Sequence, residues 1–166
     1  MERKVETQAL TEDKIPTLEE RILNVRRVST KRVGGASYHF SALAVVGDRN
    51  GKIGIGIAKS KENMVAMKKA VNRAKRGIFI VPITDKGSIA FEISSKYGAT
   101  KLLMKPAPLG AGIIAGGSVR QILELAGIKN ISAKIIGSTN KINNAYATRI
   151  ALEKLNRNRR VQITEG

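Results

Sequence analysis

The segment at residues 110–127, GAGIIAGGSVRQILELAG, has residue types and spacing that could bind a phosphate group. Glycines gather at its start, Ser118 is placed to cap a helix, and Gly127 is placed to end that helix. A glycine-rich bend before a helix can direct backbone N–H groups at a phosphate. The same bend can instead bring backbone close to another surface, because glycine has no Cβ atom. The segment therefore predicts either an enzyme site or a contact surface.

The glycine spacing favours the contact surface. Gly110, Gly112 and Gly116 spell G-x-G-x-x-x-G, which is one residue longer than the dinucleotide-binding fingerprint. The last glycine of the bend is followed by Ser118, so the Lys-Ser/Thr end of a Walker loop is missing. A kinase also needs a carboxylate for magnesium, and no acidic pair stands at a recognisable catalytic spacing. A small-molecule kinase remains the weaker alternative.

Other groups suited to catalysis are scarce in the chain. His39 is the only histidine and there is no cysteine. We therefore expect no zinc site and no nucleophile paired with a histidine base. The prediction is a protein that is not an enzyme and that holds no cofactor and no metal. The absence of cysteine fits a reducing compartment such as the cytosol.

The net charge indicates a polyanionic partner. Thirty Lys and Arg residues face 13 Asp and Glu residues, which gives a formal net charge of +17. Like charges repel in a compact fold, and a bound polyanion relieves that repulsion. Nucleic acid is the first candidate and an anionic membrane surface the second. The chain has no run of about 18 apolar residues and no signal-peptide pattern at its N-terminus, so we expect no membrane-spanning segment.

A basic ribbon in the N-terminal half could bind RNA. It combines cations for phosphates with aromatic side chains that stack on bases, around a glycine turn. Its members are Arg26, Arg27, Lys31, Arg32, Gly34, Gly35, Tyr38 and Phe40. In the alternative interpretation, Tyr38 and Phe40 are ordinary core residues of a strand.

Residues 60–78 predict a basic amphipathic helix. Ser60 can act as its N-cap, and an apolar stripe runs from Met64 to Ile78. The strand before it contains Gly54 and Gly56, which would let another element approach one of its faces closely. Four cations of the helix either bind RNA phosphates or form a solvated face. They are Lys68, Lys69, Arg73 and Arg76.

These segments predict an α+β fold in two units. The first unit, residues 18–81, is expected to hold three antiparallel strands with one helix on a face. The second unit, residues 82–155, is expected to hold about four strands and two helices. A mobile arm at residues 1–17 and a loose basic tail at residues 156–166 flank them.

The pattern of the second unit predicts particular elements. A strand at 78–83 leads into it, and further strands are expected at 88–94, 100–107 and 130–137. The last helix is expected to begin at Asn143 or Asn144. Its inward residues are Ala147, Ile150, Ala151 and Leu155.

Three segments carry more specific motifs. They are LEERILNVRRVS at 18–29, VVGDRNGKIGIGIAKS at 45–60 and GAGIIAGGSVRQILELAGIKNISAKIIGSTNKIN at 110–143. The chain from about Leu18 to Leu155 resembles the family of small ribosomal subunit protein five. The resemblance implies a double-stranded-RNA-binding-like first domain without its first helix. It implies a second domain that shares the fold of small-molecule kinases of the galactokinase–homoserine kinase type, with a bend that serves contacts rather than catalysis.

The resemblance also implies a function. Members of this family are structural constituents of the small ribosomal subunit that bind its ribosomal RNA between head and body. They contact proteins four and eight of the subunit, border the path by which messenger RNA enters, and influence translational accuracy. A cytoplasmic ribosome is expected, with an organellar ribosome as an alternative. A free-standing regulator that binds double-stranded RNA is the rival interpretation.

The motif match assigns roles to some residues. Gly112 and Arg120 match the family's contact with protein four, and we expect the same face to include Gly116 and Gly117. Arg27 and Ser29 fall in the hairpin that reaches towards RNA. The chain departs from the family's basic pattern at three hairpin positions, which are Thr30, Val33 and Ala36.

Overall fold

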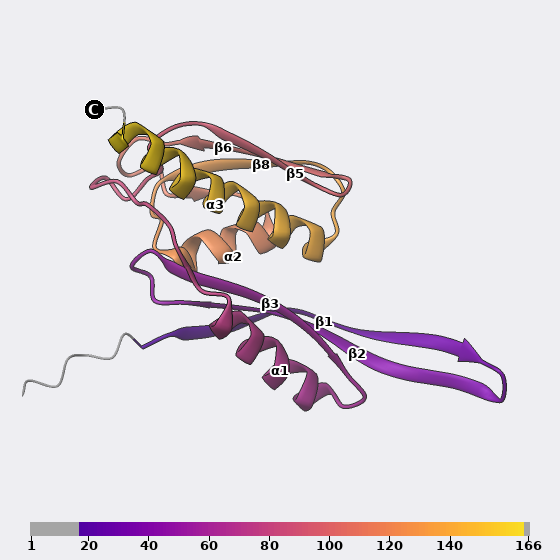
Figure 1. Cartoon of the computed structure of the whole chain (residues 1–166). Coiled ribbons are helices and arrows are strands. Elements are labelled where there is room, and N and C mark those ends of the chain that lie inside the picture. The colour runs from indigo at the N-terminus through magenta and orange to yellow at the C-terminus, as the bar shows by residue number, and fades with distance from the viewer. Residues whose placement is uncertain (1–16, 165–166) are drawn as a thin grey trace, which may run out of the picture.

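The computed structural model describes residues 17–164 and contains two four-stranded sheets and three helices within that range (Figure 1). The predicted arm at residues 1–17 lies outside the described residues except for its last position. The first sheet consists of β1 (Glu19–Arg32), β2 (Gly35–Gly47), β3 (Lys52–Ser60) and β4 (Phe79–Ile80). The second sheet consists of β5 (Ile93–Tyr97), β6 (Thr100–Pro106), β8 (Ile131–Gly137) and β7 (Ile113–Ile114). The helices are α1 (Asn63–Arg76), α2 (Gly117–Ala126) and α3 (Lys141–Thr164).

The first sheet has the expected three antiparallel strands with α1 on one face, and it gains a fourth strand. Chain segment 78–83 was predicted to lead into the second unit, but β4 instead pairs with the edge of β3. Ile80 lies opposite Lys52 and Phe79 opposite Ile53. The chain leaving α1 runs back along this open edge, where its backbone groups find ladder partners.

Helix α1 packs on the first sheet through alanines. A Cβ atom on Gly54 would overlap the carbonyl oxygen of Ala74, and one on Gly56 would overlap that of Ala70. The close approach predicted for the alternating glycines is thus confirmed, and α1 is the element that approaches. The predicted stripe is wrong at Met64, which is 62% exposed, because a helix this close to the sheet presents its small side chains.

The start of α1 also differs from the prediction. Ser60 is the last residue of β3, and Glu62 occupies the N-cap position without a side-chain cap. The β3 strand continues to Ser60 because that residue still pairs with Phe40 of β2.

In the second sheet, β5, β6 and β8 are antiparallel and β7 runs parallel to β8. The strands predicted at 100–107 and 130–137 are confirmed to within one residue. The strand predicted at 88–94 begins only at Ile93. Residues 84–88 form a turn, in which the Thr84 N–H group donates to the Ser88 carbonyl at 2.9 Å and the Thr84 hydroxyl accepts from the Ser88 N–H group at 3.2 Å. Residues 89–92 have no regular secondary structure.

Helix α2 ends as predicted and begins differently. Gly127 follows its last residue in the left-handed region, with φ 89°, and its N–H group donates to the Glu124 carbonyl at 3.1 Å. Gly116 rather than Ser118 is the N-cap residue, and no side chain caps the helix. Ser118 is instead buried inside the first turn.

Helix α3 is longer than predicted at both ends. Its N-cap is Asn140, whose side-chain oxygen accepts the Ile142 N–H group at 3.1 Å. Asn144 is not a cap, because it is buried and its Oδ1 accepts the Thr100 hydroxyl at 3.0 Å. The helix continues to Thr164, so residues 156–164 are helical rather than a loose tail. Of the predicted inward residues, Ile150 is only half-buried.

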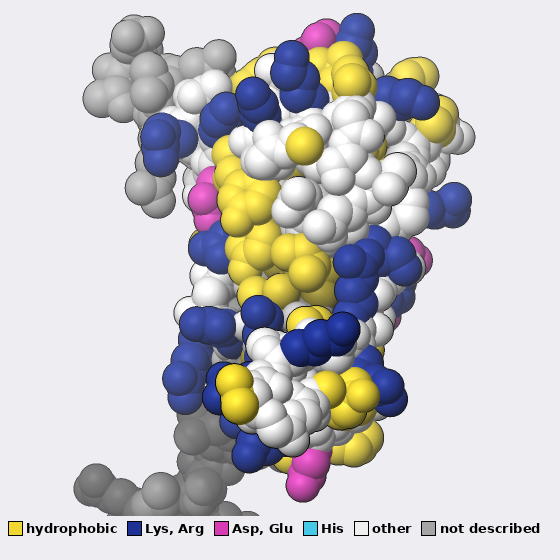
Figure 2. Space-filling model, turned by 90° about the vertical axis from the view of Figure 1, so that its right-hand side faces the viewer, with side chains coloured by type: hydrophobic (Ala, Val, Ile, Leu, Met, Phe, Trp, Pro, Cys, Tyr) yellow, Lys and Arg dark blue, Asp and Glu magenta, His cyan; other side chains and the backbone are white. Residues whose placement is uncertain are grey.

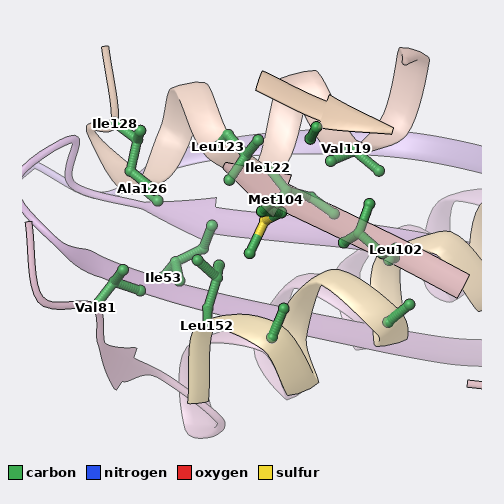
Figure 3. Packing of buried hydrophobic residues seen from close by; sticks show 14 of the residues in the cluster. Ile53, Val81, Leu102, Met104, Val119, Ile122, Leu123, Ala126, Ile128 and Leu152 are labelled. Atoms are coloured by element: carbon green, nitrogen blue, oxygen red, sulfur yellow. The ribbon is translucent and has the colours of Figure 1, made fainter. Parts of the chain in front are cut away.

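The first sheet is covered on both faces. Ala42, Ala44 and Val46 of β2 face α1, and the alternating residues Leu43 and Val45 face the second unit. Residues on this second face belong to one hydrophobic cluster that also contains residues of the second sheet, α2 and α3. Figure 3 shows part of this cluster, including Ile53, Met104 and Leu152. The two units are therefore joined by a common core.

Candidate nucleic-acid and protein interfaces

The hairpin of β1 and β2 projects beyond the rest of the first sheet (Figure 1). Pairing between β2 and β3 ends at Phe40 and Ser60, whereas β1 and β2 stay paired out to Arg32 and Gly35. Every residue from Arg26 to Ala36 is exposed. The sequence therefore located the hairpin correctly, and the structure shows that its outer part has no neighbour other than its own two strands among the described residues.

The tip is a two-residue turn formed by Val33 and Gly34. Gly34 adopts φ 93°, which favours glycine, while Gly35 already belongs to β2. The predicted Gly34-Gly35 turn is thus shifted by one residue. Val33 stands fully exposed at the tip, so an apolar side chain occupies a position where the family resemblance implied a cation.

Strand register divides the basic residues between the two faces of the hairpin. Arg27 lies opposite Phe40, Ser29 opposite Tyr38 and Lys31 opposite Ala36, so these six share one face. Arg26 and Arg32 lie on the other face. In Figure 2, which looks at the molecule from the hairpin side, Lys and Arg side chains surround the lower part of the surface. Exposed cations therefore lie on both faces of the hairpin.

The two aromatic residues of the hairpin have different roles. Tyr38 is 48% exposed, and the Arg27 guanidinium lies 4.4 Å from the centre of its ring. Phe40 is half-buried and packs on the cluster beneath α1. The core interpretation therefore fits Phe40, while Tyr38 is open to a stacking base.

The four predicted cations of α1 are all exposed, and they divide between two grooves. Lys69, Arg73 and Arg76 border a groove of about 430 Å³ between α1 and β3. The Arg73 side chain donates from Nη1 to the Ile57 carbonyl at 3.0 Å, which fixes it at the groove. Lys68 borders the opposite groove towards β1. Lys59 at the end of β3 also borders the first groove. Its position in the sequence, directly before the predicted helix start at Ser60, was the available signal, but the predicted set of RNA-binding residues did not include it.

The glycine bend is held from within the protein. The N–H groups of Gly110 and Gly112 both donate to Asn130 Oδ1, at 3.1 and 3.2 Å. Asn130 is 4% exposed, and its amide nitrogen donates to the Lys86 carbonyl at 2.8 Å. Two of the N–H groups that a phosphate would need are thus already satisfied. Asn130 lies outside the bend in sequence, and no local signal predicted this role.

The outer surface of the bend suits contact with another molecule. A Cβ atom on Gly112 or Gly117 would meet no atom within 4 Å. Leu109 is 75% and Ile114 59% exposed, and Arg120 is exposed in the first turns of α2. The structure therefore places the predicted interface residues around an open, partly apolar surface.

An ionic network joins the start of β1 and the turn between β2 and β3 to the C-terminal end of α2. Arg49 Nε and Arg21 Nη2 each lie 2.7 Å from a Glu19 carboxylate oxygen, and these guanidinium groups lower the pKa of Glu19. Arg21 also lies 3.1 Å from Glu124 of α2. Nearby, the Arg49 N–H group donates to the Leu125 carbonyl at 3.0 Å. The turn between β2 and β3 is thus fixed against the end of α2.

Two other kinds of feature are not found in the part of the chain that the structure describes. No group of three or more His, Cys, Asp or Glu residues there could hold a metal ion. No helix among those residues is long and apolar enough to cross a membrane.

The fold and these surfaces define an α+β protein with a double-stranded-RNA-binding-like first unit and an α+β second unit. The family model described as Ribosomal protein S5, N-terminal domain matches residues 18–82, and the one described as Ribosomal protein S5, C-terminal domain matches residues 95–165. The chain belongs to the ribosomal protein S5 family, whose members are ribosomal proteins rather than enzymes.

Named relatives agree with this assignment. The chain is 45% identical over 152 residues to small ribosomal subunit protein uS5 of Thermotoga maritima. The aligned region covers 91% of this chain and 85% of the relative. It is 46% identical over 144 residues to the uS5 protein of Wigglesworthia glossinidia brevipalpis, covering 87% and 86%. It is 44% identical over 140 residues to protein uS5c of Phaeodactylum tricornutum, covering 84% and 80%. These relatives give no support to a kinase or a free-standing regulator.

Proposed function

We propose that the protein is a structural constituent of the small ribosomal subunit that binds the subunit's ribosomal RNA through the β1–β2 hairpin. The observation that carries this proposal is the projection of exposed cations beyond the sheet, with Arg27 beside the open ring of Tyr38. Cations neutralise phosphates and release counterions, and an exposed aromatic ring can stack on a base. The exposed cations of α1 and the groove beside β3 extend the same surface.

The bend is proposed to bind a neighbouring ribosomal protein. By the family's pattern this neighbour is protein four of the small subunit, with protein eight as a second contact. The exposed Leu109, Ile114 and Arg120 supply an apolar surface with one cation, which suits a protein partner. A chain holding RNA at one end and protein at the other would stabilise head against body, border the path of messenger RNA and influence accuracy.

Two finer assignments accompany this proposal. We place the domain boundary at residues 81 and 82, between the two sheets. We also place the protein in a cytoplasmic ribosome, because a chain without cysteine suits a reducing compartment.

The RNA proposal is tested by the double substitution Arg26→Glu with Arg27→Glu. We expect affinity for a small-subunit ribosomal RNA transcript to fall by about tenfold or more at moderate salt, because two phosphate contacts become repulsive. Filter binding measures the affinity, and circular dichroism should show an unchanged fold. Lys86→Glu with Lys129→Glu is the control with equal charge. If the two double variants lost the same amount of affinity for the transcript, the proposed role of the hairpin would be refuted.

The protein-contact proposal is tested by Arg120→Leu. Because Arg120 is exposed and makes no ion pair among the described residues, the change should leave stability unchanged within about 0.5 kcal/mol. It should weaken the docking of protein four in subunit reconstitution and change misreading in a reporter assay. If docking and misreading both matched the wild type, the bend would not be the contact.

A further inference from the structure

The second sheet has one face that nothing covers among the described residues. Helices α2 and α3 pack against the face that carries Leu102, Met104 and Ile131, all of which are buried. The opposite face, which forms the top of the molecule in Figure 1, has no helix or strand over it. An antiparallel sheet can leave one face in water, so the uncovered face is not itself a defect.

Four exposed lysines lie on this uncovered face. Lys96 of β5 stands directly opposite Lys101 of β6, and Lys134 of β8 stands opposite Leu103. Lys134 is therefore diagonal to both Lys101 and Lys105, at about 7–8 Å between backbone positions. Figure 2 shows Lys and Arg side chains along the top of the molecule, where Figure 1 places these strands.

The arrangement does not help the sheet to fold. Like charges directly opposite each other on neighbouring strands destabilise the pair. Lys105 has a partial partner, since its Nζ lies 3.4 Å from Glu92 Oε2. Within residues 17–164, no carboxylate lies at ion-pair distance from Lys96, Lys101 or Lys134. An anion from outside the chain would relieve this repulsion.

We propose that this lysine face binds the phosphate backbone of folded RNA. Lysine is a mobile point charge suited to phosphates and is depleted from protein–protein interfaces, so an RNA partner is favoured over a protein. The aromatic residue of β5, Tyr97, stacks on Tyr146 of α3 with ring centres 5.1 Å apart and so belongs to the other face. With no ring to stack on a base, the lysine face makes contacts that do not depend on RNA sequence.

The inference rests on the proposed function and adds to it a second RNA contact, on the unit that the family's pattern assigns to protein contact. The chain then binds RNA at the hairpin and at the far sheet, with the shared core between them.

The test compares two triple variants with equal net charge. The lysine-face variant carries Lys96→Gln, Lys101→Gln and Lys134→Gln, and the control carries Lys86→Gln, Lys129→Gln and Lys141→Gln. Each lowers the formal net charge from +17 by three, to +14. Filter binding to a small-subunit ribosomal RNA transcript is measured over a series of salt concentrations, with the Arg26→Glu, Arg27→Glu hairpin variant alongside.

We expect the lysine-face variant to bind about tenfold or more weaker than the control, with a salt dependence of log K shallower by about 2 to 3. Its melting temperature should equal or exceed that of the control, because the repulsion between Lys96 and Lys101 is gone. If the hairpin variant loses affinity while the two triple variants bind alike, the lysine-face inference is overturned and the hairpin proposal stands. If the lysine-face variant binds RNA like the control but fails to assemble with a ribosomal protein, the face takes a protein and the inference is wrong. If the wild-type chain ignores the transcript, the proposed function itself fails.

Discussion

The hairpin tip and the glycine bend are both exposed, glycine-containing turns, and they differ in where their polar groups find partners. The bend is satisfied from within, because Asn130 accepts the N–H groups of Gly110 and Gly112. Among the described residues, the cations at the hairpin tip have no carboxylate at ion-pair distance. A turn whose polar groups are already satisfied can bind a partner through shape complementarity. A turn with unpaired charges can instead attract an oppositely charged partner. The two regions should therefore respond to substitution in different ways.

The largest difference is expected between two glycines with nearly equal φ angles, one at the hairpin tip and one at the end of α2. Gly127 has φ 89° and Gly34 has φ 93°, so alanine is strained at both by about 1–2 kcal/mol. At Gly127 the new Cβ would also overlap the Arg49 carbonyl oxygen, whereas at Gly34 nothing lies within 4 Å. We expect Gly127→Ala to lower the free energy of unfolding by about 3–5 kcal/mol in urea titration, and Gly34→Ala by no more than about 2 kcal/mol. Equal losses would mean that close packing does not distinguish the C-terminus of α2, which Gly127 forms, from the hairpin tip.

A smaller effect is expected from Asn130→Ala. The substitution removes the acceptor of two bend N–H groups and the donor to the Lys86 carbonyl. The free energy of unfolding should fall by about 2–4 kcal/mol, because these part-buried groups lose their partners. In the hairpin, the matched change Ser37→Ala removes only a contact of 3.3 Å to His39 and should cost less than about 0.5 kcal/mol. Amide hydrogen exchange should speed up at Gly110 and Gly112 in the Asn130 variant alone. Unchanged exchange there would contradict the internal role of Asn130.

The smallest effect is expected from the ionic network that lies away from both regions, where the start of β1 and the turn between β2 and β3 meet the C-terminal end of α2. Arg49 and Arg21 lower the pKa of Glu19, so the unfolded chain binds a proton at this carboxyl more readily than the folded chain. Its contribution to stability is therefore present above the ordinary pKa of a glutamate and is lost as pH falls through the lowered value. Glu19→Gln should reduce the melting temperature slightly at neutral pH and should match the wild type in strong acid. If the difference in melting temperature between Glu19→Gln and the wild type grew as the pH fell, the result would contradict the stabilising role of this network.

Several elements followed from the sequence because their signals are local. Gly127 ends α2 in the left-handed conformation, the turn between two basic segments makes a hairpin, and the alternation of Gly54 and Gly56 allows close packing. Each of these depends on the geometry of a few neighbouring residues. The apolar run from Ala42 to Val46 also carried a usable signal, since a strand buried on both faces shows no alternation.

Other features depended on residues far away in the chain. The face that α1 buries was set by the glycines of β3, so Ala70 and Ala74 lie inside and Met64 outside. β4 joined the first sheet because an open edge of β3 was there to pair with it. The caps at Ser60, Ser118 and Asn144 were predicted from suitable side chains, but ladder pairing, burial and a hydrogen bond to Thr100 decided otherwise.

The sequence by itself determined the excess of positive charge, the hairpin, the glycine bend, the α+β class and the family. Only the tertiary structure decided that one core joins the two units, that Asn130 satisfies the bend, and that four lysines share an uncovered sheet face. The physical reason is the range of the interactions. Turn conformations and periodicity are fixed by neighbours along the chain, whereas burial and the pairing of polar groups depend on which distant segments meet in space.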